Sequence, residues 1–247
     1  MNRVLVVVPT YNEALTIRKA IERVRLAVPE ADLLVVDDGS PDGTGAVVDE
    51  IRALDSHVNV LHRAGKQGLG AAYVAGFGWG LDHGYDVLVE MDADGSHQPE
   101  ELPRLLAALD DADLVIGSRY VRGGRVVNWP RRRELLSRVA NTYVRVALGT
   151  PLRDATAGYR AFRAETLRRI DLSTVASQGY CFQVDLAWRA ERSGLRVTEV
   201  PITFVEREHG ESKMDASVVR EALWRVATWG AAHRTSQLGG LVRGRRP

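Results

Sequence analysis

An apolar run that ends in two carboxylates constrains the fold of this chain more than any other segment. Residues 86–94 read Asp-Val-Leu-Val-Glu-Met-Asp-Ala-Asp, and the residues that follow, Gly-Ser-His-Gln-Pro, do not continue a strand comfortably. The pattern predicts a buried strand that stops at Asp92 and Asp94. Side chains at i and i+2 of an extended chain lie on the same side, so both carboxylates would face one ligand. An isolated Asp-x-Asp pair is also typical of a solvated acidic turn.

Two upstream segments repeat this design and favour the ligand site. Residues 33–44 read Leu-Leu-Val-Val-Asp-Asp-Gly-Ser-Pro-Asp-Gly-Thr, and residues 4–13 read Val-Leu-Val-Val-Val-Pro-Thr-Tyr-Asn-Glu. Strand and helix patterns alternate through the first half, which predicts a mostly parallel sheet with right-handed crossovers. Open α/β sheets bind ligands at the carboxyl ends of such strands. We therefore expect Asp92 and Asp94 to grip a hard cation that carries phosphate oxygens.

The connections between these strands carry helix patterns. Ile17, Ile21, Val24 and Val28 recur at helical spacing, which predicts a stripe that packs in the core. Lys66 precedes Gly68 and Gly70 in a weak likeness to a phosphate-binding loop, but the Walker pattern is absent. We interpret the glycines as turn residues and expect Lys66 near a bound nucleotide.

Composition excludes several classes of protein. The 33 basic and 32 acidic residues nearly balance, so no overall field favours nucleic acid as a partner. The one cysteine, Cys181, cannot form an intramolecular disulfide and suits the cytoplasm. We see no signal-peptide pattern and no apolar run long enough to cross a bilayer, so we expect no membrane span. We expect one domain over residues 1–233 and a basic flexible tail over residues 234–247.

Five motifs together resemble a known family. Pro-Thr-Tyr-Asn-Glu (residues 9–13), Val-Asp-Asp-Gly-Ser-Pro-Asp-Gly-Thr (36–44) and Met-Asp-Ala-Asp (91–94) resemble inverting nucleotide-sugar glycosyltransferases of family two. Gly-Tyr-Cys-Phe-Gln (179–183) and Phe-Val-Glu-Arg-Glu-His-Gly-Glu-Ser-Lys (204–213) narrow the likeness to dolichol- or polyprenol-phosphate mannose synthases. The likeness extends from about residue 4 to residue 229. It implies a GT-A fold: one Rossmann-like, mostly parallel sheet flanked by helices, followed by C-terminal amphipathic helices.

The resemblance also implies a donor site. It places these residues on the nucleotide-sugar side: Pro9, Tyr11, Glu13, Val36, Asp37, Asp38, Asp92, Ala93, Asp94, Arg119, Arg207 and Lys213. Of these, Asp92, Asp94, Arg119, Arg207 and Lys213 are the expected catalytic residues, with Asp92 and Asp94 holding Mg²⁺ or Mn²⁺. Arg207 and Lys213 flank Gly210 in a loop that we expect to close over the diphosphate. For Arg119, a surface salt bridge is the alternative.

An acceptor side is implied as well. Residues 154–160, Asp-Ala-Thr-Ala-Gly-Tyr-Arg, resemble the family segment Asp-x-Thr-Ser-Gly-Phe-Arg, with departures at Ala157 and Tyr159. The expected acceptor-side residues are Thr156, Arg160, Gln183, Asp185 and Ser212. A lipid monophosphate has a second pKa near 6 and is mostly a dianion at neutral pH, so its attack needs no general base. We therefore expect Asp185 to orient a neighbouring arginine instead of accepting a proton.

Residues 122–148 differ in character from the rest of the chain. Arginines at 122, 125, 131, 132 and 133 surround Trp129, and a helix pattern follows. The pattern puts Leu136, Val139, Ala140, Tyr143 and Ala147 on one face and Arg138, Asn141 and Arg145 on the other. A basic amphipathic helix with an interfacial tryptophan is typical of membrane-surface binding. The alternative is a helix whose apolar face packs on the domain. A further helix, near residues 218–232, would either cover the sheet or lie at the interface.

The implied activity is inverting transfer of mannose from GDP-mannose to a polyprenyl phosphate, which yields a β-linked lipid phosphate. We expect the enzyme to be peripheral on the cytoplasmic face of a membrane, and a membrane-protein partner that supplies anchorage is compatible with this. Transfer of glucose from UDP-glucose stays open, because no residue that reads the base or the sugar epimer is recognisable. A catalytically silent membrane adaptor is the third hypothesis, and the intact Asp92/Asp94 pair argues against it.

Overall fold

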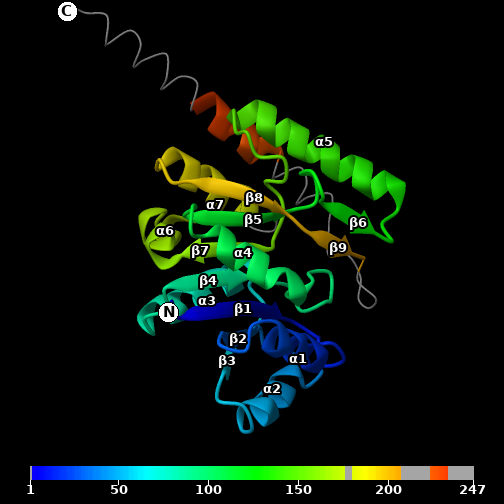
Figure 1. Cartoon of the computed structure of the whole chain (residues 1–247), viewed down its shortest axis with the longest axis vertical. Coiled ribbons are helices and arrows are strands. Elements are labelled where there is room, and N and C mark those ends of the chain that lie inside the picture. The colour runs from blue at the N-terminus through cyan, green and yellow to red at the C-terminus, as the bar shows by residue number, and fades with distance from the viewer. Residues whose placement is uncertain (1, 176–179, 207–222, 233–247) are drawn as a thin grey trace, which may run out of the picture.

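A seven-stranded sheet organises the protein, whose computed structural model describes residues 2–175, 180–206 and 223–232 (Figure 1). Its strands, in spatial order, are β3 (Val58–His62), β2 (Asp32–Asp37), β1 (Val4–Thr10), β4 (Val87–Glu90), β7 (Arg160–Arg163), β5 (Leu114–Ser118) and β8 (Val197–Pro201). β7 runs antiparallel to both of its neighbours, and the other pairings are parallel. A short parallel ribbon pairs β6 (Arg125–Val127) with β9 (Thr203–Val205). The predicted mostly parallel sheet is confirmed.

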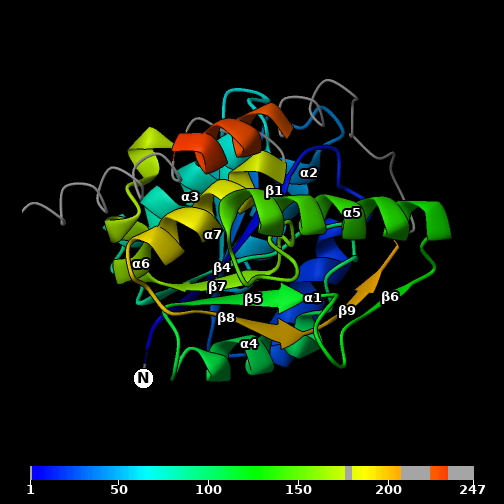
Figure 2. The same cartoon turned by 90° about the horizontal axis from the view of Figure 1, so that it is seen from above.

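Helices cover both faces of this sheet (Figure 2). They are α1 (Ile17–Ala27), α2 (Thr44–Arg52), α3 (Leu69–Asp82), α4 (Leu102–Ala108), α5 (Arg131–Leu148), α6 (Ala164–Arg169) and α7 (Tyr180–Arg192), with short 3₁₀ turns at Pro99–Glu101 and Leu172–Thr174. Residues 223–232 form a further helix. Among the described residues, no helix combines the length and the apolar character that crossing a membrane requires.

Two apolar cores lie on opposite faces of the sheet. Alternate residues of β1 enter each core: Leu5 and Val7 join α3 and α7, whereas Val6 and Val8 join α1 and α4. The predicted stripe of α1 is confirmed, since Ile17, Ile21 and Val24 are buried. Because the central strands are covered on both faces, they are continuous runs of Val and Leu.

Strand register brings the polar strand ends to one edge. Thr10 at the end of β1 pairs with Asp37 at the end of β2, and Val7 pairs with Glu90 at the end of β4. Antiparallel β7 begins at this same edge, where Arg160 pairs with Glu90. The loop before β7 therefore lies at the same edge of the sheet as the ends of β1, β2 and β4. The prediction that these strand ends meet is confirmed.

Helix α5 is confirmed, and one of its faces is buried while most of its predicted apolar stripe is exposed. Asn141, Val144 and Leu148 are buried, whereas Leu136 and Val139 are 54% and 56% exposed. The prediction that Asn141 shares a face with Arg138 and Arg145 was therefore wrong, because both arginines are exposed. Its amide is satisfied in the interior, because it donates to Ser137 O and Thr156 Oγ1 at 3.0 Å each.

The 223–232 helix packs against α5 and α7 (Figure 2). The Tyr143 hydroxyl donates to Leu223 O at 2.9 Å, and Trp188 stacks on Trp229 with ring centroids 5.7 Å apart. The helices approach so closely that a Cβ on Gly230 would lie 2.3 Å from Ala147 O. This helix thus extends the helical layer over one face of the sheet.

Candidate active site

Asp92 lies just past the end of β4 and is held from two sides. Its backbone N–H donates to His97 Nδ1 at 3.0 Å, and the Tyr73 hydroxyl donates to its Oδ1 at 3.3 Å. Burial, followed by the charge of Asp92, raises the pKa of Tyr73 well above its ordinary value, so the phenol keeps its proton. Asp94 accepts a hydrogen bond from the Ser96 backbone N–H at 3.0 Å. The two carboxylates are half-buried at the sheet edge.

This donor set fits a hard divalent cation. Besides the two carboxylates, the buried Ser96 Oγ has no hydrogen-bond partner among the described residues. In the same part of the chain, no group of three or more His, Cys, Asp and Glu side chains is arranged to hold a metal. Two carboxylates and a hydroxyl leave coordination positions for substrate phosphates and water, which is how Mg²⁺ is usually bound. We therefore retain Asp92 and Asp94 as the candidate metal ligands.

The acidic pair at the end of β2 already has protein partners. Asp37 accepts hydrogen bonds from Thr10 Oγ1 at 3.2 Å and from the Ser40 backbone N–H at 3.1 Å. Asp38 pairs with the guanidinium of Arg63, a residue that the sequence reasoning missed. Both carboxylates are buried. They fix the loops on the side of the edge where the sequence predicts the nucleotide.

The remaining nucleotide-side candidates differ in how they can act. Lys66 lies over the ring of Tyr11, with its Nζ 4.6 Å from the ring centroid, so the loop before α3 is next to the loop after β1. Glu13 is tied into this region through its backbone N–H, which donates to Thr44 Oγ1 at 2.9 Å. The side chains of Val36 and Ala93 belong to the apolar cores. A nucleotide would reach these two residues through their backbone. Pro9 is half-buried within β1, beside Val36 of β2.

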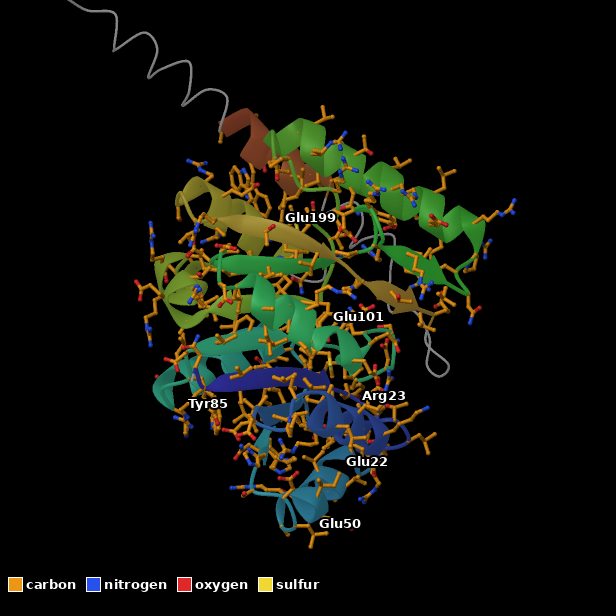
Figure 3. All side chains as sticks on the ribbon, viewed as in Figure 1. Glu22, Arg23, Glu50, Tyr85, Glu101 and Glu199 are labelled. Carbon is orange, nitrogen blue, oxygen red and sulfur yellow. The ribbon has the colours of Figure 1, made fainter. Side chains whose placement is uncertain are left out.

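Arg119 forms a buried ion pair instead of the surface salt bridge considered as the alternative. Its Nε and Nη2 donate to Asp154 at 2.8 and 2.6 Å, and its backbone N–H donates to the same carboxylate at 2.8 Å. Nη2 also donates to Thr156 Oγ1 at 3.0 Å. Asp154 is fully buried, and Glu199 of β8, which Figure 3 labels, accepts hydrogen bonds from the backbone N–H groups of residues 153 and 154. Sequence reasoning did not identify Asp154 as the partner.

Trp129 lies between two arginines. The Arg119 and Arg133 guanidinium carbons are 5.4 and 4.7 Å from its ring centroid, and Phe204 meets it edge to face. Arg133 is held by Glu206, with Nη1 to Oε1 at 2.5 Å. Trp129 is therefore half-buried between these side chains, and its expected place at a membrane interface stays a prediction.

Arg160 lies in the core. It is fully buried, and its guanidinium donates to the carbonyl oxygens of Ala155, Ala157 and Gln183 at 2.6–2.7 Å. The expected contact with an acceptor is therefore replaced by a structural one, which ties the 154–159 loop to α7.

Glu90 faces Arg160 across the β4–β7 pair, and the sequence reasoning passed over it. Burial raises the pKa of Glu90 to about 8, although Arg160 opposes this shift. The Gln183 side chain lies near enough to Glu90 to lower its pKa as well, although the Glu90 oxygens and the Gln183 amide complete no hydrogen bond of good geometry within the described residues. An acidic residue in the otherwise apolar strand β4 was the sequence feature that could have identified Glu90.

Asp185 orients an arginine, as expected. Arg189 Nε donates to Asp185 Oδ1 at 2.6 Å, one helical turn along α7. Thr156, predicted on the acceptor side, accepts hydrogen bonds from Arg119 and Asn141. Arg207, Ser212 and Lys213 lie outside the described residues, as do Gly179 and the 234–247 tail.

Comparisons with known proteins agree with this architecture. Residues 5–171 match the model of the family described as glycosyl transferase family 2. The chain is 60% identical over 243 residues to polyprenol monophosphomannose synthase of Mycolicibacterium smegmatis. The aligned region covers 98% of this chain and 92% of the relative. It is also 60% identical over 232 residues to undecaprenyl-phosphate mannosyltransferase of Micrococcus luteus. This alignment covers 94% of this chain and 96% of the relative.

A solved structure shares the fold. Glucosyl-3-phosphoglycerate synthase of Mycobacterium tuberculosis, solved with Mn²⁺, UDP-glucose and phosphoglyceric acid, superposes with a TM-score of 0.67 and 24% identity. The match covers 93% of this chain and 80% of the solved one. The predicted GT-A fold is thereby confirmed.

Proposed function

Because this chain belongs to glycosyl transferase family 2, we propose that it transfers mannose from GDP-mannose to a polyprenyl monophosphate, with inversion at the sugar carbon. Two relatives at 60% identity, one named for polyprenol and mannose and the other for undecaprenyl phosphate and mannose, support the sugar and the acceptor. The structural observation that carries the proposal is the position of Asp92 and Asp94, at the edge where the ends of β1 and β2 also meet.

Asp92 and Asp94 would hold Mg²⁺ or Mn²⁺. The bound cation would neutralise the negative charge that develops on the leaving diphosphate. The Mn²⁺ of the solved structure that shares the fold supports this assignment. Among the residues that the structure describes, Arg119 is the cationic side chain that we assign to the donor phosphates. Since Asp154 fixes its guanidinium, little reorganisation would be needed when charge develops. Arg207 and Lys213 would close over the diphosphate.

The acceptor side contains no assigned general base. A phosphate dianion is already a nucleophile, so a single displacement inverts the sugar centre without removal of a proton. The ion pair between Asp185 and Arg189 supports this, because the carboxylate has a structural partner. An alcohol acceptor would instead require a base at the attacking oxygen.

We also propose that α5 contacts the cytoplasmic face of an anionic membrane. Its outward residues Leu135, Leu136, Val139 and Val146 are 54–67% exposed, and Arg131, Arg132, Arg138 and Arg145 beside them are exposed too. An apolar stripe flanked by arginines is the composition of an interfacial helix. Trp224, 72% exposed on the neighbouring helix, adds to this surface. Such contact would present the lipid phosphate to the sheet edge, and a membrane protein could add anchorage.

One assay tests the donor and the acceptor together. Purified protein is incubated with polyprenyl phosphate and labelled GDP-mannose or UDP-glucose, and the lipid phase is extracted. We expect label in the lipid with GDP-mannose. Equal or greater transfer from UDP-glucose would replace mannose by glucose, and no transfer from either donor would favour the silent adaptor.

A further inference from the structure

Tyr73 reaches Asp92 from the covering helix α3. Its side chain is fully buried, and its hydroxyl donates to Asp92 Oδ1 at 3.3 Å. The ring is stacked on Phe77 at 5.9 Å and on Phe182 at 6.0 Å between centroids. Because the ring is fully buried and packed against two other rings, its hydroxyl has little freedom to move. A distance of 3.3 Å is long for an O–H···O hydrogen bond, so the bond is weak. Its main effect would be to favour one orientation of the Asp92 carboxylate.

His97 supports Asp92 from another direction. Its Nδ1 accepts the Asp92 backbone N–H, which places the proton of a neutral imidazole on Nε2. The imidazole stacks on Tyr159 with centroids 4.8 Å apart and meets Phe204 edge to face at 5.6 Å. The backbone of Asp92 is thus fixed by His97, and its carboxylate is oriented by Tyr73.

We propose that Tyr73 is a positioning residue that sets the orientation of the Asp92 carboxylate for the metal. This rests on the proposed function, since it requires a cation at Asp92. The metal site draws few ligands from the protein, so each carboxylate must be directed correctly before the donor arrives. Partners that orient a metal ligand typically change metal affinity or activity by about 10- to 100-fold when removed.

The test is Tyr73→Phe, which removes the hydroxyl and keeps the stacked ring. Tyr85→Phe is the matched control: it also removes a tyrosine hydroxyl that donates to an aspartate, Asp32 Oδ2 at 2.6 Å. Tyr85 lies at the other end of the sheet, before β4 begins (Figure 3). Mn²⁺ binding in the presence of GDP is measured by the electron paramagnetic resonance of free Mn²⁺, and thermal unfolding is followed in parallel.

We expect Tyr73→Phe to weaken Mn²⁺ binding by about 10- to 100-fold, and Tyr85→Phe to bind as the wild type does. Saturating Mn²⁺ should restore most of the turnover of Tyr73→Phe. An equal loss in both variants would indicate a general effect of lowered stability and would overturn the inference.

A third variant separates this inference from the proposed metal site. If Asp92→Asn loses Mn²⁺ binding while Tyr73→Phe keeps wild-type affinity, the positioning role is wrong and the metal site stands. If Asp92→Asn itself binds Mn²⁺ as tightly as the wild type, the metal site fails and the inference fails with it.

Discussion

Asp154 and Arg119 form a buried ion pair that joins two segments 35 residues apart. Two guanidinium nitrogens and the backbone N–H of Arg119 all donate to this one carboxylate, at 2.6–2.8 Å. Asn141 of α5 donates to the same carboxylate at 3.3 Å. The arginine assigned to the phosphates, the acceptor-side loop and the helix assigned to the membrane surface therefore share a single anchor.

Asp154→Asn should destabilise the fold strongly. The change would leave the charge of Arg119 buried without its counterion, which typically costs about 3–5 kcal/mol. Urea unfolding measures this cost. Asp110→Asn, at an exposed position, is the control and should stay within about 0.5 kcal/mol of the wild type. Similar stabilities for the two variants would show that Asp154 is not the anchor of Arg119.

Asp92→Asn and Asp94→Asn should each lose most lipid-sugar synthesis while circular dichroism stays unchanged. Each substitution removes a negative charge and keeps the side-chain volume, so the metal is lost and the fold is kept. EDTA should have the same effect on the wild type, reversed by Mg²⁺ or Mn²⁺. Full turnover in EDTA would refute metal dependence.

Asp185→Asn should retain substantial turnover. Removal of a general base typically costs about a hundred- to ten-thousand-fold in rate, whereas loss of the pairing with Arg189 should cost much less. The acidic limb of the rate profile should follow the second ionisation of the acceptor phosphate, near pH 6. A loss within the general-base range, with donor binding intact, would point to an alcohol acceptor.

Arg131→Gln combined with Arg132→Gln should weaken sedimentation with anionic liposomes. The loss should be largest at low salt, because surface charge is least screened there. Arg133 is left intact, since it pairs with Glu206. Arg52→Gln in α2, at the opposite end of the molecule, is the control (Figure 1). Turnover with a short water-soluble prenyl phosphate should survive, and unchanged liposome binding would make α5 ordinary scaffold.

Gly230→Ala should loosen the 223–232 helix from α5. The added Cβ would lie 2.3 Å from Ala147 O. Because this is a backbone atom, no change of side-chain rotamer can relieve the clash. Gly78→Ala in α3 is the matched control, since its Cβ would meet nothing within 4 Å. Alanine is the better helix former by about 1 kcal/mol, so the control should be neutral or stabilised. Equal melting temperatures for both variants would contradict the close approach of the two helices.

Local pattern in the sequence determined much of the fold and part of the site. The spacing of Ile17, Ile21 and Val24 predicted the buried face of α1, because helical periodicity is a property of neighbouring residues. The carboxylates after β2 and β4 predicted the ligand edge, because parallel strands end together. Asp185 and Arg189 are four residues apart on one helix, so their pairing was also accessible to sequence reasoning.

Tertiary structure decided the partners of the polar side chains. Asp154 meets Arg119, Tyr73 meets Asp92 and Arg160 faces Glu90 only because the sheet places β7 antiparallel between β4 and β5 and lays α3 and α7 over it. Strand order and helix placement are set by the packing of the whole core, and no local period records them. The orientation of α5 has the same origin: buried hydrogen-bond partners draw Asn141 inward, and Leu136 and Val139 are left at the surface.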